Sequence, residues 1–294
     1  MKLVYINSNG QALDFFGMDN VAVFNIEGLG PTELTKGTLQ KAYSDGIIIN
    51  STARAERQVI INLALEGGRL NDAIRRKIYS VIGDKRAGFL RYIDEEIDVF
   101  TEAYAEAPQV DTWTLEPTMQ ISFICPSAFF KDWNETVLDL SQINPQLQFP
   151  LAIPEETGGM VMGEETPAVS GFTLINHGQA STGVKIVVDF TQAVTGVKIA
   201  NESNGDMLKV AAPALIGGSF QAGDVLTITT ETGEKGAILY RAGAYTDIFS
   251  AVTYGEQWLR IERGRNVLRY SHADSADTAG LLIKISFNAL YWGI

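Results

Sequence analysis

The sequence predicts a mostly β protein with two domains, the first of which is α+β. Three observations lead to this fold class. Segments in which apolar and polar residues alternate, as in half-buried strands, recur along much of the chain. Only residues 70–82 have the period of an amphipathic helix. The length of 294 residues exceeds what one hydrophobic core usually spans, which favours two domains.

The first clear strand covers residues 58–65, and Gly67 and Gly68 end it. The spacing of apolar residues then lengthens to about four, which predicts a helix over residues 70–82. Gly83 suits the left-handed end of that helix, and basic residues follow near the negative end of the helix dipole. The apolar positions of the helix are Leu70, Ala73, Ile74, Ile78, Val81 and Ile82.

Two strands follow the helix, over residues 89–93 and 97–104, and a third covers residues 119–125. An acidic turn joins the first two. Its carboxylates could bind Ca²⁺ or act as a pair in glycoside hydrolysis, but the ligand order of a calcium loop is missing and a solvated hairpin tip is favoured. The acidic residues are Asp94, Glu95, Glu96 and Asp98.

A stretch rich in proline and glycine, residues 144–167, predicts the connection between the domains, because proline removes strand donors and glycine loosens the backbone. The predicted division is a first domain of residues 1–140, a connection of residues 141–168 and a second domain of residues 169–294. In the second domain, short strand patterns separated by turn residues predict a β-sandwich. They cover residues 184–190, 197–200, 225–230, 237–240, 258–261, 266–270 and 281–287.

The formal net charge of −12 argues against nucleic acid or anionic lipid as a primary ligand, because it removes the attraction for phosphate groups. The single cysteine, Cys125, excludes an intrachain disulfide and a multi-cysteine metal site. The amino-terminal residues lack the apolar core of a signal peptide, and no apolar stretch reaches the length of a membrane span. We therefore expect a soluble protein made in the cytoplasm, with no membrane partner.

Residues typical of catalysis are few. Only His177 and His272 could act as bases near neutral pH, and their separation does not fit a metal-ligand spacing. Ser219 follows two glycines, but Gln221 stands where a nucleophile elbow requires glycine. No glycine-rich phosphate loop is present. The sequence therefore predicts no enzyme, no cofactor and no metal.

Aromatic residues in the second half could form a stacking platform for sugar, as in carbohydrate-binding modules. Most of them are expected in the core, and for Trp258, which lies on a predicted strand, packing is favoured over binding. The set is Tyr240, Tyr245, Tyr254, Trp258, Tyr270, Tyr291 and Trp292.

The order of short motifs over residues 46–294 is similar to a known pattern. In the first domain these motifs are residues 57–63, 87–92 and 121–126, followed by Phe129 and Phe130. In the second domain they are residues 176–178, 199–201, 204–205, 223–228 and 264–268. Together they resemble the distal tail proteins of long-tailed, non-contractile bacteriophages. The chain departs from that pattern at Ser127-Ala128, where Asp-Pro is expected, and at Arg263, where proline is usual.

The resemblance implies a first domain that assembles with five further copies into a ring continuing the tail tube. It also implies that the second domain is a galectin-like or carbohydrate-module-like β-sandwich. The ring would be the structural hub of the tail tip in the virion, assembled in the cytoplasm of the host bacterium. Its implied partners are the major tail tube protein, the tape-measure protein, a tail-associated lysin or fibre protein, and receptor-binding proteins. Double-stranded DNA would pass through the channel transiently, and like charges would keep it from binding.

Two surfaces are candidates within such a ring. A closed ring needs two different complementary surfaces on each copy, and the exposed side of the helix, with Arg75, Lys77 and Tyr79, is one candidate contact. The acidic turn with Asp94, Glu95, Glu96 and Asp98 is a candidate for the channel side.

Two other functions stay open on the sequence alone. The first alternative is a carbohydrate-binding module that attaches to cell-wall glycans through its aromatic residues and Asn/Asp turns. The second is a glycoside hydrolase with an unrecognised carboxylate pair, which nothing in the sequence specifically favours.

Overall fold

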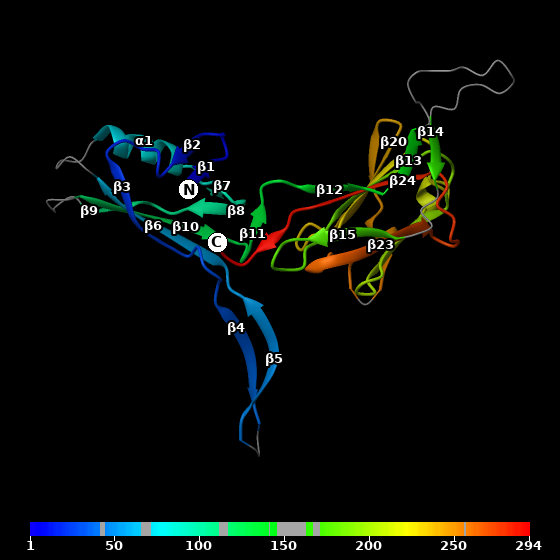
Figure 1. Cartoon of the computed structure of the whole chain (residues 1–294), viewed down its shortest axis with the longest axis horizontal. Coiled ribbons are helices and arrows are strands. Elements are labelled where there is room, and N and C mark those ends of the chain that lie inside the picture. Colours follow the sequence, from blue (N-terminus) through cyan, green and yellow to red (C-terminus); the bar gives the residue numbers. More distant parts are fainter. Residues whose placement is uncertain are drawn as a thin grey trace. The chain divides into compact units, whose positions relative to one another are not determined.

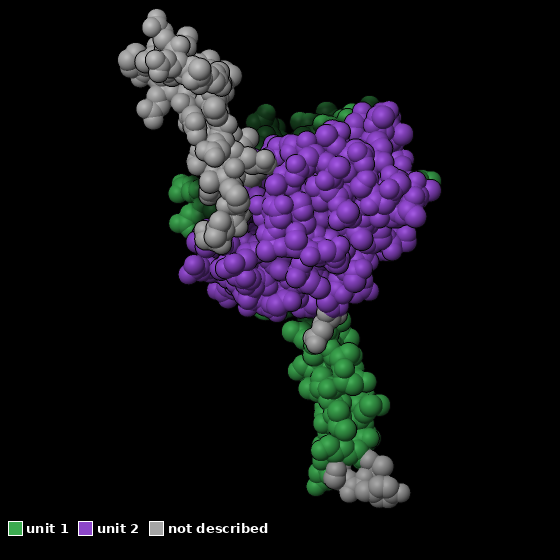
Figure 2. Space-filling view, turned by 90° about the vertical axis from the view of Figure 1, so that its right-hand side faces the viewer, with its two compact units in different colours: residues 1–134, 290–294 green, residues 135–289 purple. Residues whose placement is uncertain are grey.

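The computed structural model describes residues 1–41, 45–65, 72–111, 117–140, 142–145, 163–166, 171–255 and 257–294. The chain forms two compact units, Met1–Asn134 with Leu290–Ile294, and Glu135–Ala289 (Figures 1 and 2). Regular structure in these ranges is antiparallel β-sheet with one α-helix and two short 3-10 helices, so the predicted mostly β fold class is confirmed. No helix in the described ranges is long and apolar enough to cross a membrane.

The first unit is built on one antiparallel sheet with the strand order β2-β1-β7-β8-β10-β6-β3. Strand β9 pairs with β10, β11 pairs with β8, and β25 pairs with β11. The bounds are β1 Lys2–Ile6, β2 Ala12–Asp14, β3 Val21–Glu27, β6 Arg57–Leu65, β7 Gly88–Ile93, β8 Asp98–Ala105, β9 Gln109–Asp111, β10 Thr118–Cys125, β11 Phe130–Asp132 and β25 Leu290–Tyr291.

Helix α1 (Asp72–Ile82) packs on one face of this sheet. Its buried residues Ile78, Val81 and Ile82 lie in one hydrophobic core with inward-facing residues of β1, β2, β6, β7, β8 and β10. The predicted helix and the four predicted strands around it are confirmed, because each has one buried face that sets a regular period. The expected start of the helix at Leu70, and Gly67 and Gly68 before it, lie outside the described residues.

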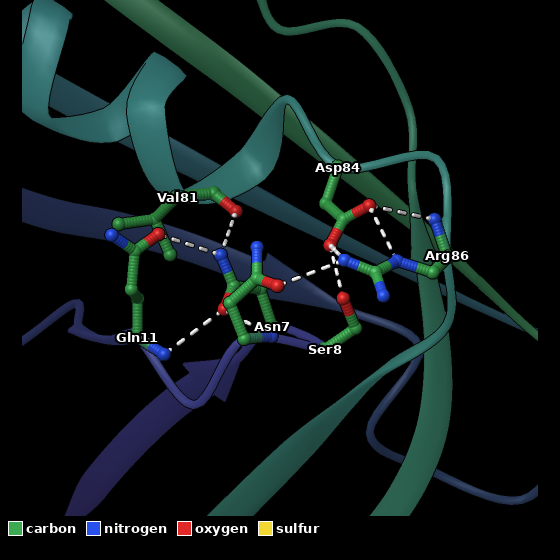
Figure 3. A network of polar contacts seen from close by, with 7 residues as sticks. Asn7, Ser8, Gln11, Val81, Asp84 and Arg86 are labelled. Carbon is green, nitrogen blue, oxygen red and sulfur yellow. Dashed lines mark hydrogen bonds and ion pairs between the residues drawn. The ribbon is translucent and has the colours of Figure 1, made fainter.

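A polar network holds the end of α1 against the turn after β1 (Figure 3). The buried Asn7 side chain donates a hydrogen bond of 3.1 Å to the carbonyl of Val81 in the last helical turn. Beyond the helix, Asp84 accepts hydrogen bonds from Ser8 and from the side chain and backbone of Arg86. The bond from Ser8 is the first cause of a lowered pKa of Asp84. The last carbonyl groups of a helix have no hydrogen-bond donor within the helix, and Asn7 supplies such a donor to Val81.

The second unit is a β-sandwich, as predicted, because its two antiparallel sheets enclose one hydrophobic core. The first sheet has the order β12 (Thr136–Asp139), β24 (Leu281–Phe287), β16 (Lys185–Phe190), β19 (Val225–Thr229), β20 (Gly236–Arg241) and β21 (Ala244–Asp247). The second has the order β15 (Phe172–Asn176), β23 (Gly264–His272), β17 (Gly196–Asn201), β18 (Met207–Ala211) and β22 (Val252–Tyr254). Two 3-10 helices accompany them, η1 (Ala214–Ile216) and η2 (Phe249–Ala251).

Both ends of the second unit differ from the predicted domain boundaries. Strand β12, expected in the first domain, pairs with β24 so that Thr136 lies opposite Phe287. Strand β25, expected in the second domain, pairs with β11 of the first unit. Of the predicted connection 141–168, residues 142–145 and 163–166 are described, and they pair as strands β13 (Gln142–Pro145) and β14 (Gly163–Thr166). The rest of the connection lies outside the described residues.

The predicted strand over residues 258–261 is wrong. This segment makes only a single bridge, between Ile261 and Thr182. Side chains supply hydrogen-bond donors that a neighbouring strand would otherwise supply. The carbonyl of Leu259 accepts a hydrogen bond from the Thr230 side chain, and that of Arg260 accepts one from the Asn201 side chain. The apolar pattern that suggested a strand reflects burial in the sandwich core.

Candidate functional site

The most conspicuous surface of the first unit is a hairpin made of β4 (Leu34–Gln40) and β5 (Ile47–Arg54). Among the described residues the two strands pair only with each other, and they form a narrow extension of the unit (Figures 1 and 2). Their large apolar side chains are between 48% and 58% exposed, namely those of Leu34, Leu39, Ile47, Ile48 and Ile49. An isolated two-stranded hairpin is marginally stable in water, so these side chains form a surface suited to binding.

The outer half of this hairpin is apolar on both faces. Leu39 lies directly opposite Ile48, and opposite residues share a face. Ile47 and Ile49 flank Ile48 in the strand and therefore point to the other face. Residues 37–40 and 47–53 carry no charge. Sequence reasoning missed this hairpin, although the run of three isoleucines was a signal of buried or bound apolar surface.

A second exposed apolar surface lies on the sheet face opposite α1. Phe89, Tyr104 and Ile124 are each 40–45% exposed, and each precedes or follows a buried residue of its strand. Phe24 lies at an irregularity of β3, where the pairing with β6 shifts register, and is 61% exposed. We call the surface formed by Phe24, Phe89, Tyr104 and Ile124 the open face. Polar side chains share this face, since exposed Glu102 lies opposite Phe89, and Asn62 and Gln120 line a pocket with Phe24.

The predicted helix residues lie on the side of α1 that faces away from the core. Lys77 is exposed and Tyr79 is 40% exposed, whereas Arg75 is half-buried. Neighbouring Ile78 is fully buried, as the helical period requires. A contact between copies through these side chains stays a prediction.

The predicted acidic turn joins β7 and β8, and two of its four carboxylates are engaged within the unit. Asp98 forms a two-point ion pair with Arg91, at 2.7 and 2.5 Å, and the Arg91 guanidinium lies 3.8 Å from the ring centroid of Trp133. The pKa of Asp94 is lowered, first by a hydrogen bond from the backbone N–H of Glu95. The side chains of Glu95 and Glu96 are exposed. A channel role for this turn stays a prediction.

The residues considered for catalysis do not form a group in the described structure. His177 is exposed, and His272 pairs through Nε2 with the carbonyl of Ala279 at 2.7 Å. The hydroxyl of Ser219 accepts a hydrogen bond from Gln221, at 2.6 Å. Among the described residues no cluster of three or more His, Cys, Asp or Glu could hold a metal ion.

The aromatic set of the second half divides into three groups. Trp258 is buried, which confirms its predicted packing, and so is Tyr270. Tyr240, Tyr245 and Tyr254 are exposed, contrary to the expectation that most of the set lies in the core. Tyr240 and Tyr245 lie opposite each other on β20 and β21, and Tyr240 follows the buried Leu239, so both side chains point away from the core. Tyr291 and Trp292 belong to the first unit instead.

Taken with the fold, these surfaces define a two-unit β protein with exposed apolar side chains on its first unit. Residues 177–291 match the family model of the siphovirus-type tail component, C-terminal domain. The predicted resemblance to the distal tail proteins of long-tailed phages is thereby confirmed over this part of the chain.

The chain is similar to the Dit protein of phage SPP1, described as a paradigm of the hub adsorption apparatus in phages that infect Gram-positive bacteria, with a TM-score of 0.64, 15% identity and 98% of each chain covered. It is also similar to a chain of the phage P2 baseplate in its activated conformation with Ca, with a TM-score of 0.49, 13% identity and 98% of each chain covered. Comparison with curated protein sequences gives no match.

Proposed function

We propose that this protein is the hub of the phage tail tip and acts by assembly. Six copies form a ring that joins the tail tube to the tail-tip or baseplate and receptor-binding apparatus. The single observation that carries the proposal is the β4–β5 hairpin, whose exposed apolar side chains have no partner strand outside the hairpin among the described residues. A surface of this kind on a structural tail component is suited to a contact between copies.

In the proposed ring, the hairpin of one copy packs on the open face of the next copy. The two surfaces are different and both carry exposed apolar side chains, and a closed ring of identical subunits needs two different complementary surfaces. The exposed side of α1, with Lys77 and Tyr79, is a further candidate at the same boundary. The net charge of −12 lets double-stranded DNA pass through the channel without being held.

The proposed partners follow from this place in the particle. They are the tail tube protein above the ring, the tape-measure protein, a tail-associated lysin or fibre protein below it, and receptor-binding proteins. The protein functions in the virion, at the tail tip, after assembly in the cytoplasm of the host.

Light scattering of the full chain over a range of concentrations, with negative-stain images of the same peak, tests the proposal. Six copies of 32.1 kDa correspond to about 193 kDa. We expect a six-membered ring for the wild type, and monomers for Ile48→Asp and for Phe89→Asp. Thr52→Asp adds the same charge to an exposed position of β5 and should still assemble. A wild type that stays monomeric at every concentration, or an Ile48→Asp ring, would overturn the proposed contact.

A second candidate function is binding of cell-wall glycans by the second unit. It is supported by three exposed tyrosines, of which Tyr240 and Tyr245 lie with ring centroids 5.0 Å apart. A glycan array separates the two functions, since selective binding that is lost in Tyr245→Ala supports the second candidate. Absence of selective binding rejects it.

A further inference from the structure

The last residues of the chain return to the first unit at the base of the β4–β5 hairpin. Strand β25 pairs with β11, with Tyr291 opposite Phe130. The backbone N–H of Ile294 donates a hydrogen bond of 3.0 Å to the carbonyl of Leu29, a few residues before β4. Gly293 packs so closely on Gly30 that a Cβ atom there would lie 2.8 Å from a backbone atom. Residues 290–294 therefore touch the segment that leads into the hairpin.

A buried guanidinium ties this segment to both ends of the hairpin. Arg57 follows β5 by three residues and is almost fully buried. Its Nη2 donates to the carbonyl of Trp292 at 2.6 Å and to that of Ala128 at 2.9 Å. Its Nη1 donates to the carbonyls of Gly28 and Gly30 in the segment before β4. One side chain thus joins the entry and the exit of the hairpin to the end of the chain.

A second arginine adds an aromatic contact on the hairpin itself. The guanidinium carbon of Arg54, the last residue of β5, lies 4.0 Å from the ring centroid of Trp292. Its Nη1 donates a hydrogen bond of 2.9 Å to the carbonyl of Thr32, just before β4. The Trp292 ring therefore lies directly against the hairpin base.

We propose that residues 290–294 act as a clasp that fixes the direction of the β4–β5 hairpin and so prepares the first unit for assembly. The hairpin shares no strand pairing with the main sheet, and short segments connect it to β3 and β6, so it would otherwise pivot at its base. A contact surface that can pivot loses orientational freedom when it binds, and this loss costs free energy. A hairpin whose direction is already fixed in the monomer avoids that cost. The clasp rests on the proposed function, because it assumes that the hairpin is the assembly contact.

Spin labels on the hairpin and beside the end of α1 test the clasp in dilute, monomeric protein. Lys36→Cys on β4 and Lys85→Cys in the turn after α1 are exposed sites within the first unit, and the native Cys125 is buried. Pulsed electron resonance gives the distribution of distances between the labels. We expect a narrow distribution for the wild-type background and a broad one for Trp292→Ala, with assembly shifted to about tenfold higher concentration or more.

Trp133→Ala is the matched control. Trp133 lies in the same unit, is 39% exposed compared with 38% for Trp292, and contacts Arg91 as Trp292 contacts Arg54. It should leave the distribution narrow. If Trp292→Ala does not fold, Arg54→Gln removes the same contact from the hairpin side.

The outcomes separate the clasp from the proposed function. A narrow distribution in folded Trp292→Ala, or normal assembly despite a broad one, overturns the clasp. Normal assembly of Ile48→Asp overturns the hairpin contact instead, and that result does not depend on the label distances.

Discussion

The guanidinium carbon of Arg57 lies 4.2 Å from the ring centroid of Phe130, in the interior of the first unit. The arginine is 1% exposed, and it donates hydrogen bonds to four main-chain carbonyls. Burial is the largest influence on its pKa, which is lowered. A buried cation held in this way satisfies four carbonyl groups from three separate segments, so it acts as a structural centre of the unit.

Arg57→Met should lower the free energy of unfolding of the first unit by about 3 kcal/mol, because it leaves buried carbonyls without donors. Arg54→Met is the control, since Arg54 is less buried and its loss should cost about 1 kcal/mol. Urea unfolding of the full chain measures both. Equal stabilities for the two variants would contradict the role of Arg57.

Gly28→Ala should prevent normal packing of β3 on β6. Gly28 has φ of +86°, and a Cβ atom there would lie 1.8 Å from the carbonyl oxygen of Gln58. Gly10 has φ of +79° with nothing within 4 Å of such an atom. Calorimetry should show a loss of about 4 kcal/mol or more for Gly28→Ala, from clash and backbone strain together, and about 1 kcal/mol for Gly10→Ala, from strain alone. Similar losses would refute the close approach.

The thiol of Cys125 should be unreactive in the folded protein. It is fully buried, and burial raises its pKa to about 12, so little thiolate forms near neutral pH. A maleimide at about pH 8 should label it only after the first unit unfolds. Rapid labelling of the folded chain would show that β10 opens locally.

Asp224 should make the free energy of unfolding of the second unit depend on pH in the acidic range. Burial raises the pKa of Asp224, but hydrogen bonds from Arg241 and from the N–H of Gln221, with the charge of Arg241, together hold it below its ordinary value. The contribution of Asp224 to the free energy of unfolding is therefore complete above the pKa of about 4 that an aspartate has in the unfolded chain. It is lost as the pH falls through the lower pKa of Asp224 in the folded protein.

Asp224→Asn should accordingly lower the free energy of unfolding by about 2 kcal/mol at neutral pH, and the difference from wild type should shrink below about pH 4. The matched variant is Asp274→Asn, which breaks an exposed ion pair with Lys209 and should change stability by less than about 0.5 kcal/mol. If the stability difference between Asp224→Asn and wild type is the same at neutral pH and below about pH 4, Asp224 is not the source of the acid dependence.

The parts of the fold that the sequence predicted are those with a local period. Strand β6 and helix α1 each bury one regular face, so their apolar residues recur at fixed spacing. The β4–β5 hairpin buries no face within the chain, and its isoleucines are therefore adjacent rather than alternating. A periodicity search could not find it, because nearly all residues of both strands are exposed and no buried face sets a period.

Long-range contacts were also beyond the reach of local patterns. Arg57 and Trp292 are 235 positions apart, and nothing in either neighbourhood signals that β25 returns to the first unit. The pairing of Asp98 with Arg91 was within reach, since the two residues lie on neighbouring strands of a predicted hairpin. The number of charges in the acidic turn does not reveal this pairing, so a solvated turn was expected there.

The return of β25 makes the second unit an insertion within the first. Its two ends lie side by side, because Thr136 pairs opposite Phe287 on one side of the junction and Phe130 pairs opposite Tyr291 on the other. An inserted domain whose two ends lie close together can be exchanged without disturbing the domain that carries it. The order of the chain therefore allows recombination to replace the inserted domain as one block while the sequence of the first unit stays unchanged.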